Sequence, residues 1–203
     1  RCSHLVFVES LRLEKYQVVT LNPARTKKTF DLAHSAKKVV QTYALIKNYS
    51  GGKWQGQQTS VFLQSSDSRK KVISQIQIYL NDNKLLGVSL DFESLPAEAQ
   101  SNLVLFSSEL QKSLHSNNQS LSIHVPANDP TWQYKKLSQY ADQLILMDYD
   151  QHQANSEAGA IAAIGWFSSN IKNLQRIIYS VKLVVGLASY AYDWVDNKAQ
   201  GLT

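Results

Sequence analysis

The chain has 203 residues, a formal net charge of +5, 43% hydrophobic residues and 18% charged residues. This composition is typical of a globular domain, and no apolar run approaches the roughly 18 residues of a membrane span, so we expect no membrane contact by this segment. The basic residues are scattered and accompany no recognised nucleic-acid motif, which argues against binding to nucleic acid.

The start of the chain and its cysteine and histidine content limit the possible extent of the protein and its possible disulfides, cofactors and metals. The chain opens on Arg1 rather than on Met and shows no signal peptide, so we expect a piece of a longer protein. The single cysteine, Cys2, excludes an internal disulfide and a CxxC metal or redox site. No GxGxxG or P-loop motif is present and the histidines form no metal-ligand set, so neither a cofactor nor a metal is expected.

Short apolar runs predict six strands, which alternate with helical patterns along the chain. In chain order the strands are Leu5–Val8, Val39–Ile46, Leu86–Phe92, Leu121–Val125, Gln143–Met147 and Leu183–Leu187. This alternation indicates parallel β/α units, and the apolar character of both strand faces fits a sheet that is covered on both sides. We interpret residues 1–203 as a single domain, for which a doubly wound sheet and a (β/α)8 barrel both remain open at this level.

Three helices are predicted from apolar side chains at helical spacing. The first has Val72, Ile76 and Leu80 on one face and a cap at Asp67 or Ser68. The other two are marked by Leu103, Phe106, Leu110 and Leu114, with Pro96 near the start, and then by Trp166, Phe167, Ile171 and Leu174.

Polar and aromatic side chains gather where the predicted strands end. In a β/α barrel the chemistry lies at the carboxyl ends of the strands, so these residues predict a site for a polar ligand with flat apolar faces. A sugar is such a ligand, and a nucleobase is another. The residues are Asn48, Asp91, Glu93, Asp148, Tyr149, Asp150, His152, Tyr190 and Trp194, with Trp54 and Trp132 as candidates for exposed stacking platforms.

Asp91 and Glu93 are two residues apart, so they face the same way on a strand, with their Cα atoms about 7 Å apart. Two like charges this close disfavour joint ionisation, so one carboxyl is expected to hold a proton near neutral pH, as a general acid must. Two acids on one strand do not easily flank a glycosidic bond from opposite sides, so one would transfer a proton and the other would position a group. The alternative is that both acids mark the solvated end of a strand.

The segments GVSLDFE, LILMDYDQH, GAIAAIGWF and GLASYAYDW resemble segments of family 18 glycoside hydrolases. The similarity is greatest to a chitinase-like bacterial branch, found in spore-wall hydrolases and in proteins that fuse such a domain to a polysaccharide deacetylase and a glycosyltransferase. The resemblance covers about His4 to Trp194 and implies a (β/α)8 TIM-type barrel. Such barrels have about 250 residues, so this chain implies an incomplete one, with about strands 2–7 present.

The same resemblance implies a retaining glycoside hydrolase in which the 2-acetamido oxygen of the substrate attacks the anomeric carbon. Glu93 would protonate the leaving oxygen, Asp91 would hold the acetamido N–H, and Tyr149 would donate a hydrogen bond to the acetamido carbonyl. The substrate would be a polysaccharide or oligosaccharide containing N-acetylhexosamine (peptidoglycan, a chitin-like chain or exopolysaccharide), outside the cytoplasm or in the cell envelope. Substrate contacts are expected from Ser89, Asn48, Asp150, His152, Tyr190 and Trp194.

Departures from the family pattern keep a second hypothesis open. The full pattern is D-x-x-D-x-D-x-E, and its first two acidic positions are Leu86 and Ser89 here. Ser89 can hydrogen-bond Asp91 but cannot share a proton with it as an acid would. Asp148 is an additional acid that the pattern does not explain. The alternative function is therefore a non-catalytic carbohydrate-binding or structural domain of a larger polysaccharide-modifying protein with deacetylase or glycosyltransferase modules.

Overall fold

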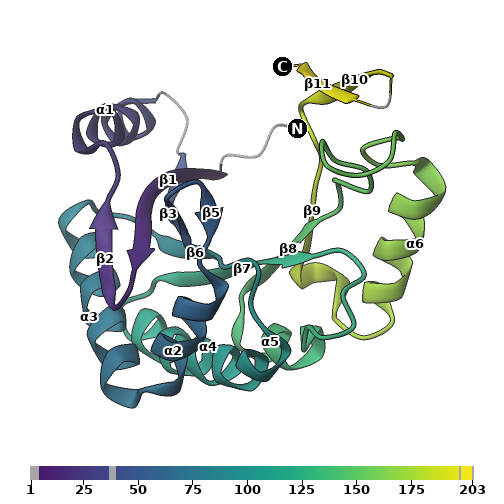
Figure 1. The fold of residues 1–203 in the computed structure, drawn as a ribbon. Helices are drawn as coiled ribbons and strands as arrows, with labels where there is room; N and C mark the ends of the chain where they lie inside the picture. The colour runs from purple at the N-terminus through teal and green to yellow at the C-terminus, as the bar shows by residue number, and fades with distance from the viewer. Residues whose placement is uncertain (1–4, 37–39, 197, 203) are drawn as a thin grey trace.

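The computed structural model describes residues 5–36, 40–196 and 198–202, and its centre is one curved sheet of seven strands (Figure 1). Their order across the sheet is β2-β1-β3-β6-β7-β8-β9. The neighbouring strands from β1 to β9 are parallel, whereas β2 runs antiparallel to β1. The strands are β1 (Leu5–Glu14), β2 (Gln17–Thr20), β3 (Gln41–Lys47), β6 (Gly87–Asp91), β7 (Ser120–Pro126), β8 (Gln143–Met147) and β9 (Leu183–Gly186).

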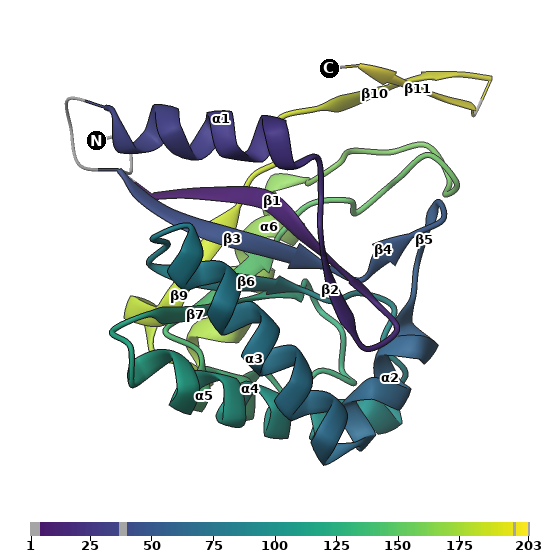
Figure 2. The same cartoon turned by 90° about the vertical axis from the view of Figure 1, so that its left-hand side faces the viewer.

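Helices cover the outer side of the curved sheet, and Figure 2 shows α3, α4 and α5 beneath its strands. The helices are α1 (Pro23–His34), α2 (Gly56–Gln64), α3 (Ser66–Asp82), α4 (Gln100–His115), α5 (Tyr134–Tyr140) and α6 (Ile164–Gln175), with 3-10 turns η1 (Ala97–Ala99) and η2 (Ser180–Lys182). Two small hairpins are formed by β4 (Tyr49–Ser50) with β5 (Lys53–Trp54) and by β10 (Ala191–Val195) with β11 (Lys198–Leu202). None of the helices among the described residues is long and apolar enough to cross a membrane.

All six predicted strands are present, although some of their ends differ from the prediction. β1 continues to Glu14 and turns at Lys15, which has a φ of 54°, into the additional strand β2. β3 begins at Gln41, and Val39, where this strand was expected to begin, lies outside the described residues. β9 ends at Gly186, one residue before the predicted end at Leu187.

The three predicted helices are α3, α4 and α6, and the cap predicted for α3 is wrong. Ser65 is the N-cap, because its Oγ accepts a hydrogen bond from the Ser68 N–H at 3.2 Å. This bond satisfies one of the free N–H groups of the first helical turn, which neither Asp67 nor Ser68 does here. Pro96 precedes the η1 turn, so α4 itself begins later, at Gln100.

The sheet follows the path of a TIM-type barrel but does not close. Its two edges are β2 and β9, and no pairing joins them within the described ranges. The fold is therefore the expected incomplete barrel, in which the carboxyl ends of β3, β6, β7, β8 and β9 point the same way. Parallel strands bring the residues that follow them to one end of the barrel, which is where catalytic groups lie in this architecture.

Alternation along the strands separates an apolar outer face from a more polar interior. On β3, Ala44 and Ile46 are fully buried, whereas Tyr43 and Lys47 alternate with them and face the interior. The main core between sheet and helices contains Val72, Ile76, Leu80, Val88, Leu90, Leu103, Phe106, Leu110, Leu114, Leu121 and Ile123. This outer layer stabilises the sheet, which leaves the inner face free to carry polar groups.

We expect Phe106→Ala to lower the free energy of unfolding by about 3–5 kcal/mol, because truncating a buried aromatic ring leaves a cavity. The Phe106 ring is fully buried and contacts Phe62 edge to face, with ring centroids 5.1 Å apart. Urea denaturation followed by circular dichroism measures the change. Leu105→Ala, on the same helix at a side chain that is 44% exposed, is the matched control and should cost far less. Equal losses for the two variants would contradict the assignment of this core.

Candidate active site

The strand β6 carries the two acids to the end of the barrel. All five of its residues are buried, and Ser89 and Asp91 share its interior face by alternation. Gly87 precedes them on the same face, where a Cβ atom would lie 2.5 Å from the Tyr43 ring and 2.2 Å from the Ser120 carbonyl oxygen. Only glycine fits at this position, so β6 can lie tightly between β3 and β7.

Asn48 fixes the backbone of Glu93 from both sides. Its Oδ1 accepts a hydrogen bond from the Glu93 N–H at 3.0 Å, and its Nδ2 donates to the Glu93 carbonyl oxygen at 3.0 Å. The same Nδ2 also donates to Thr59 Oγ1 at 3.0 Å, and Asn48 is fully buried. This differs from the substrate contact that we expected of Asn48, because its amide already has protein partners and is not accessible to a ligand.

The loop after Glu93 is held equally tightly. A Cβ atom on Gly56, the first residue of α2, would lie 1.7 Å from the Ser94 carbonyl oxygen, so α2 begins directly against this loop. Ser94 itself has a φ of 55°, a conformation that is uncommon for residues other than glycine. The Glu93 side chain therefore projects from a backbone fixed by Asn48, Gly56 and the Ser94 turn.

The two carboxyl groups are stabilised as neutral acids by their removal from water. Burial raises the pKa of Asp91 to about 6, a rise that the nearby Lys47 ammonium opposes and the Glu9 carboxylate reinforces. Burial also raises the pKa of Glu93 to about 7, and the charge of Asp91 adds to this rise. Glu93 therefore retains its proton to a higher pH than Asp91 does, which is the order that an acid and a neighbouring carboxylate require.

Tyr149 faces the same two acids from the end of β8. Burial, together with the charges of Asp91, Glu93 and Asp150, raises its pKa to about 12, so the phenol keeps its proton and can donate a hydrogen bond. Gly186 on the neighbouring strand β9 makes room for the ring, since a Cβ atom there would lie 3.1 Å from Tyr149 Cε1. Three of the predicted site residues are thus brought together from β6 and β8.

Asp150 and Tyr190 extend this cluster towards the last hairpin. The Tyr190 hydroxyl donates a short hydrogen bond to Asp150 Oδ1, and burial followed by this carboxylate raises the Tyr190 pKa well above its usual range. The Tyr149 and Tyr190 rings meet edge to face with centroids 6.4 Å apart. Asp150 has a φ of 62°, a left-handed conformation that is uncommon for residues other than glycine, in the turn after Tyr149.

His152 and Trp194 lie in a different part of the site. His152 Nδ1 lies 3.1 Å from the Glu157 carbonyl oxygen, and its ring packs where a Cβ atom of Gly159 would be. The Trp194 Nε1–H donates to the Gly159 carbonyl oxygen at 3.1 Å. The contacts of His152 lie within the loop between β8 and α6, and the Trp194 bond joins this loop to the hairpin β10–β11.

Three other predicted candidates are buried or packed against neighbouring side chains. Asp148 is fully buried, and its Oδ1 accepts a hydrogen bond from Asn170 Nδ2 on α6 at 2.8 Å, on the opposite side of the chain from Tyr149. Trp132 is 8% exposed, so the prediction of an exposed stacking platform is wrong for it. The Trp54 ring packs edge to face against Tyr49, with centroids 5.1 Å apart.

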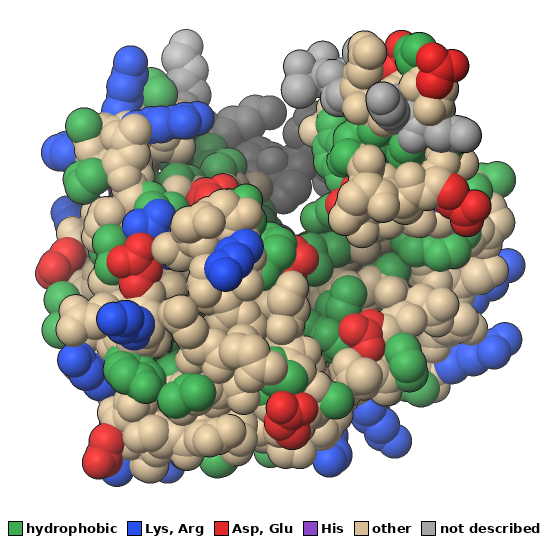
Figure 3. All heavy atoms as spheres, in the orientation of Figure 1, with side chains coloured by type: hydrophobic (Ala, Val, Ile, Leu, Met, Phe, Trp, Pro, Cys, Tyr) green, Lys and Arg blue, Asp and Glu red, His purple; other side chains and the backbone are tan. Residues whose placement is uncertain are grey.

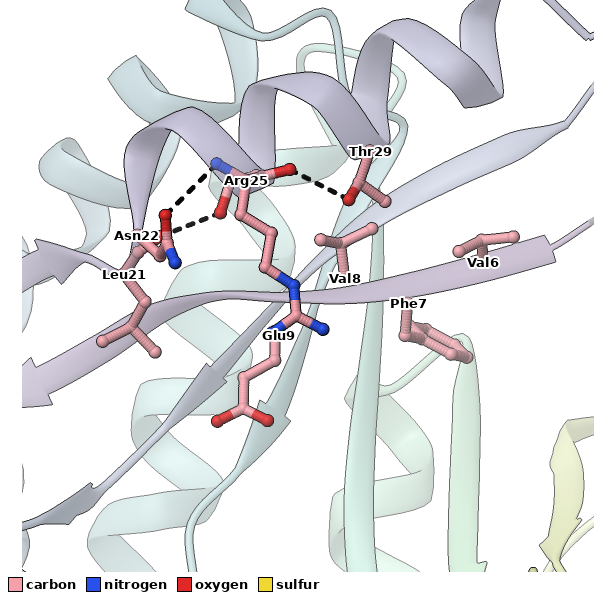
Figure 4. A pocket seen from close by; sticks show the side chains of 9 residues that line it. Val6, Phe7, Val8, Glu9, Leu21, Asn22, Arg25 and Thr29 are labelled. Atoms are coloured by element: carbon pink, nitrogen blue, oxygen red, sulfur yellow. Dashed lines mark hydrogen bonds between the residues drawn. The ribbon is translucent and has the colours of Figure 1, made fainter.

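The surface is hollowed between the side that carries α1 and the side that carries β10 and β11 (Figure 3). A separate pocket of about 430 Å³ lies between β1 and α1, and its lining includes Glu9 and Arg25 but neither Asp91 nor Glu93 (Figure 4). Within the described ranges, no three His, Cys, Asp or Glu side chains lie close enough together to hold a metal ion.

Comparison with known proteins assigns the chain to a family. Residues 1–202 match the family model described as glycosyl hydrolases family 18. The chain belongs to this family.

Three proteins that are similar to this family 18 domain illustrate the match. It is 26% identical over 177 residues to the uncharacterized glycosylase YvbX of Bacillus subtilis (strain 168), a match that covers 82% of this chain and 52% of YvbX. The spore cortex-lytic enzyme SleL of Bacillus cereus superposes with a TM-score of 0.86 at 19% identity, over 98% of this chain and 48% of that one. A class V chitinase mutant from Nicotiana tobaccum, in complex with NAG4, gives a TM-score of 0.83 at 18% identity, over 98% and 66% of the two chains. The family 18 domain thus spans about half the length of YvbX.

The interior of the family 18 barrel holds three charged or titratable residues that the sequence did not single out. Lys47 Nζ lies 2.9 Å from Glu9 Oε2 and 4.0 Å from Asp91 Oδ2. The His124 ring meets the Phe7 ring with centroids 6.2 Å apart, although their strands are separated by two others, so both rings face the interior. Alternation with Tyr43 could have predicted that Lys47 lies on this face. Its partners Glu9 and Asp91 could not be predicted, because they are distant in sequence.

We expect Glu93→Gln to stabilise the family 18 domain at pH 8 and to have less effect at pH 4. In the folded chain the pKa of Glu93 is raised from 4.5 to about 7, so the folded state binds the extra proton and loses stability as pH rises between these values. Removing the ionisable group removes a cost on the order of 2 kcal/mol above that window, after allowance for solvent screening.

Thermal unfolding of the Glu93→Gln variant and the unsubstituted chain across pH 4 to 8, read by circular dichroism, tests this. Glu98→Gln makes the same change at an exposed carboxylate and should show no such trend. A melting-temperature difference that is constant with pH would show that Glu93 is solvated as an ordinary surface acid.

Proposed function

We propose that this family 18 domain catalyses retaining, substrate-assisted hydrolysis of glycosidic bonds in N-acetylhexosamine-containing polysaccharide. The observation that carries this proposal is the convergence of Asp91, Glu93 and Tyr149, in which the two acids hold their protons to different pH values. A proton donor, a carboxylate and a phenol are the three groups that the chemistry needs.

The proposed reaction begins with the sugar whose anomeric carbon is attacked. The carbonyl oxygen of its 2-acetamido group forms a bond to the anomeric carbon as the bond to the leaving oxygen breaks. Glu93 transfers its proton to that oxygen and becomes a carboxylate. A water molecule then attacks the anomeric carbon, Glu93 takes back a proton from it, and the ring formed with the acetamido group reopens.

The neighbouring groups stabilise the charge that develops on the acetamido group. Asp91 accepts a hydrogen bond from the acetamido N–H and balances the positive oxazolinium charge. The Tyr149 hydroxyl donates to the acetamido carbonyl oxygen, which orients it towards the anomeric carbon. Tyr190, Asp150, His152 and Trp194 would contact the sugar or shape the rim around it. Asn48 fixes the backbone of Glu93, and Ser89 is buried beneath Asp91.

The substrate proposed is a chain with N-acetylhexosamine units, such as peptidoglycan, a chitin-like polymer or exopolysaccharide, met at the cell envelope. The names of two similar proteins support this range, since SleL is a spore cortex-lytic enzyme and the chitinase was solved with NAG4. Deacetylase or glycosyltransferase modules in a longer protein would fit the same substrates.

The second candidate function is carbohydrate binding without hydrolysis. Ser89 favours it, because its buried hydroxyl has no hydrogen-bond partner among the described residues and supplies no acid beneath Asp91. Isothermal calorimetry combined with an assay for reducing ends distinguishes the two candidates. A binding domain would take up oligosaccharide without releasing reducing ends.

The catalytic proposal predicts that Glu93→Gln lowers the rate of hydrolysis of N-acetylglucosamine oligomers by about 10²- to 10⁴-fold, the usual contribution of a general acid. Release of reducing ends measures the rate. Glu98→Gln, an exposed carboxylate five residues along, should hydrolyse the oligomers at the rate of the unsubstituted chain. Hydrolysis by Glu93→Gln at that same rate would remove Glu93 from the mechanism.

A further inference from the structure

Lys47 places a cation inside the barrel beside the acids. It is the last residue of β3 and pairs in register with Asp91 on β6. Its side chain is 25% exposed, and its Nζ lies between Glu9 Oε2 at 2.9 Å and Asp91 Oδ2 at 4.0 Å. One ammonium group is therefore placed between two carboxylates that come from different strands.

Asp91 has few other means of carrying a negative charge. Its Oδ1 has no hydrogen-bond partner among the described residues, and the Ser89 hydroxyl beneath it is unpartnered too. A buried carboxylate without a partner is costly, so an opposite charge within ion-pair distance decides whether it ionises. Among the residues that the structure describes, the ion pair of Asp91 is with Lys47.

The other groups that face Asp91 supply no positive charge to it. His124 on β7 has its pKa lowered to about 4, by burial first and then by Lys47, so its ring is neutral near neutral pH. Glu93 lies in the loop that follows β6, and Lys47 only partly opposes the rise of its pKa that burial and Asp91 cause. Tyr149 is a protonated phenol, and Arg25 extends from α1 towards Glu9 (Figure 4).

We propose that Lys47 is a positioning residue that divides its charge between Glu9 and Asp91, and that it thereby keeps Asp91 ionised where Ser89 supplies no charge. This role rests on the proposed function, in which Asp91 must be a carboxylate when positive charge develops on the acetamido group. Glu9 weakens the hold of Lys47 on Asp91, so the two residues act on Asp91 with opposite sign.

The pH dependence of kcat/KM on N-acetylglucosamine oligomers tests the proposal. Lys47→Met should move the acid limb to higher pH by about one unit, the lower end of the effect of an opposite charge about 4 to 6 Å away. At a pH below the acid limbs of both proteins, such a shift lowers kcat/KM of Lys47→Met about tenfold relative to the unsubstituted chain. Lys47→Arg should restore the position of the limb.

Glu9→Gln gives the opposite expectation, because Asp91 then has the whole charge of Lys47. Its acid limb should move to lower pH. Lys27→Met makes the same change as Lys47→Met at an exposed lysine that pairs with Asp31, and it should leave the profile where it was. A limb that does not move in Lys47→Met, or that moves upward in Glu9→Gln, would overturn the proposal.

A second measurement needs no enzymatic activity. The Asp91 side-chain carbon, followed by NMR through a pH titration, should report a higher midpoint in Lys47→Met and a lower one in Glu9→Gln. These shifts support the charge-sharing role even if the unsubstituted chain hydrolyses nothing, in which case the proposed function fails separately. Equal midpoints in all three proteins would overturn the role of Lys47, whatever the activity.

Discussion

The candidate site depends on the exclusion of water from two carboxyl groups at the end of one strand. Asp91 lies on β6, whose five residues are all buried, and Glu93 follows it into a loop fixed by Asn48. Removal from water raises the pKa of both acids into the range from about 6 to about 7. The apolar layer between sheet and helices packs on the outer face of β6, which lies between two parallel neighbours.

The same exclusion requires the interior to supply charge selectively. Lys47 provides positive charge near Asp91, whereas His124 is held neutral and Ser89 carries no charge. Tyr149 remains a hydrogen-bond donor because its ionised form would be buried beside carboxylates. Between about pH 6 and about pH 7 this leaves a carboxylate at Asp91 and a proton at Glu93, which is a division of roles between two chemically similar acids.

Much of this arrangement could be predicted from the sequence, because it is local. The apolar runs locate the six strands, and the polar residues immediately after them locate Asp91, Glu93 and Tyr149, since parallel strands end together. The incomplete barrel also followed from the number of strands that the family resemblance could account for. The strands and the residues at their ends need only periodicity and the order of the segments along the chain, whereas the barrel was implied by the resemblance alone.

Other features could not be predicted, because they depend on contacts between distant parts of the chain. Asn48 and Glu93 are 45 residues apart, so a strand-exit asparagine was interpreted as a ligand contact when it fixes a backbone instead. Lys47 and Glu9 are 38 residues apart, and nothing local marks them as partners. Trp132 is buried by packing, and the sequence around it gives no sign of this.

The central claim is that the acetamido group of the substrate performs the first attack while Glu93 transfers the proton. NMR of the products formed in the first minutes of hydrolysis of a β-linked N-acetylglucosamine oligomer tests it most directly. Two successive inversions at one carbon predict that the new reducing end forms as the β-anomer and converts to the α-anomer only later. An α-anomer as the first product would show direct attack by water and would contradict this mechanism.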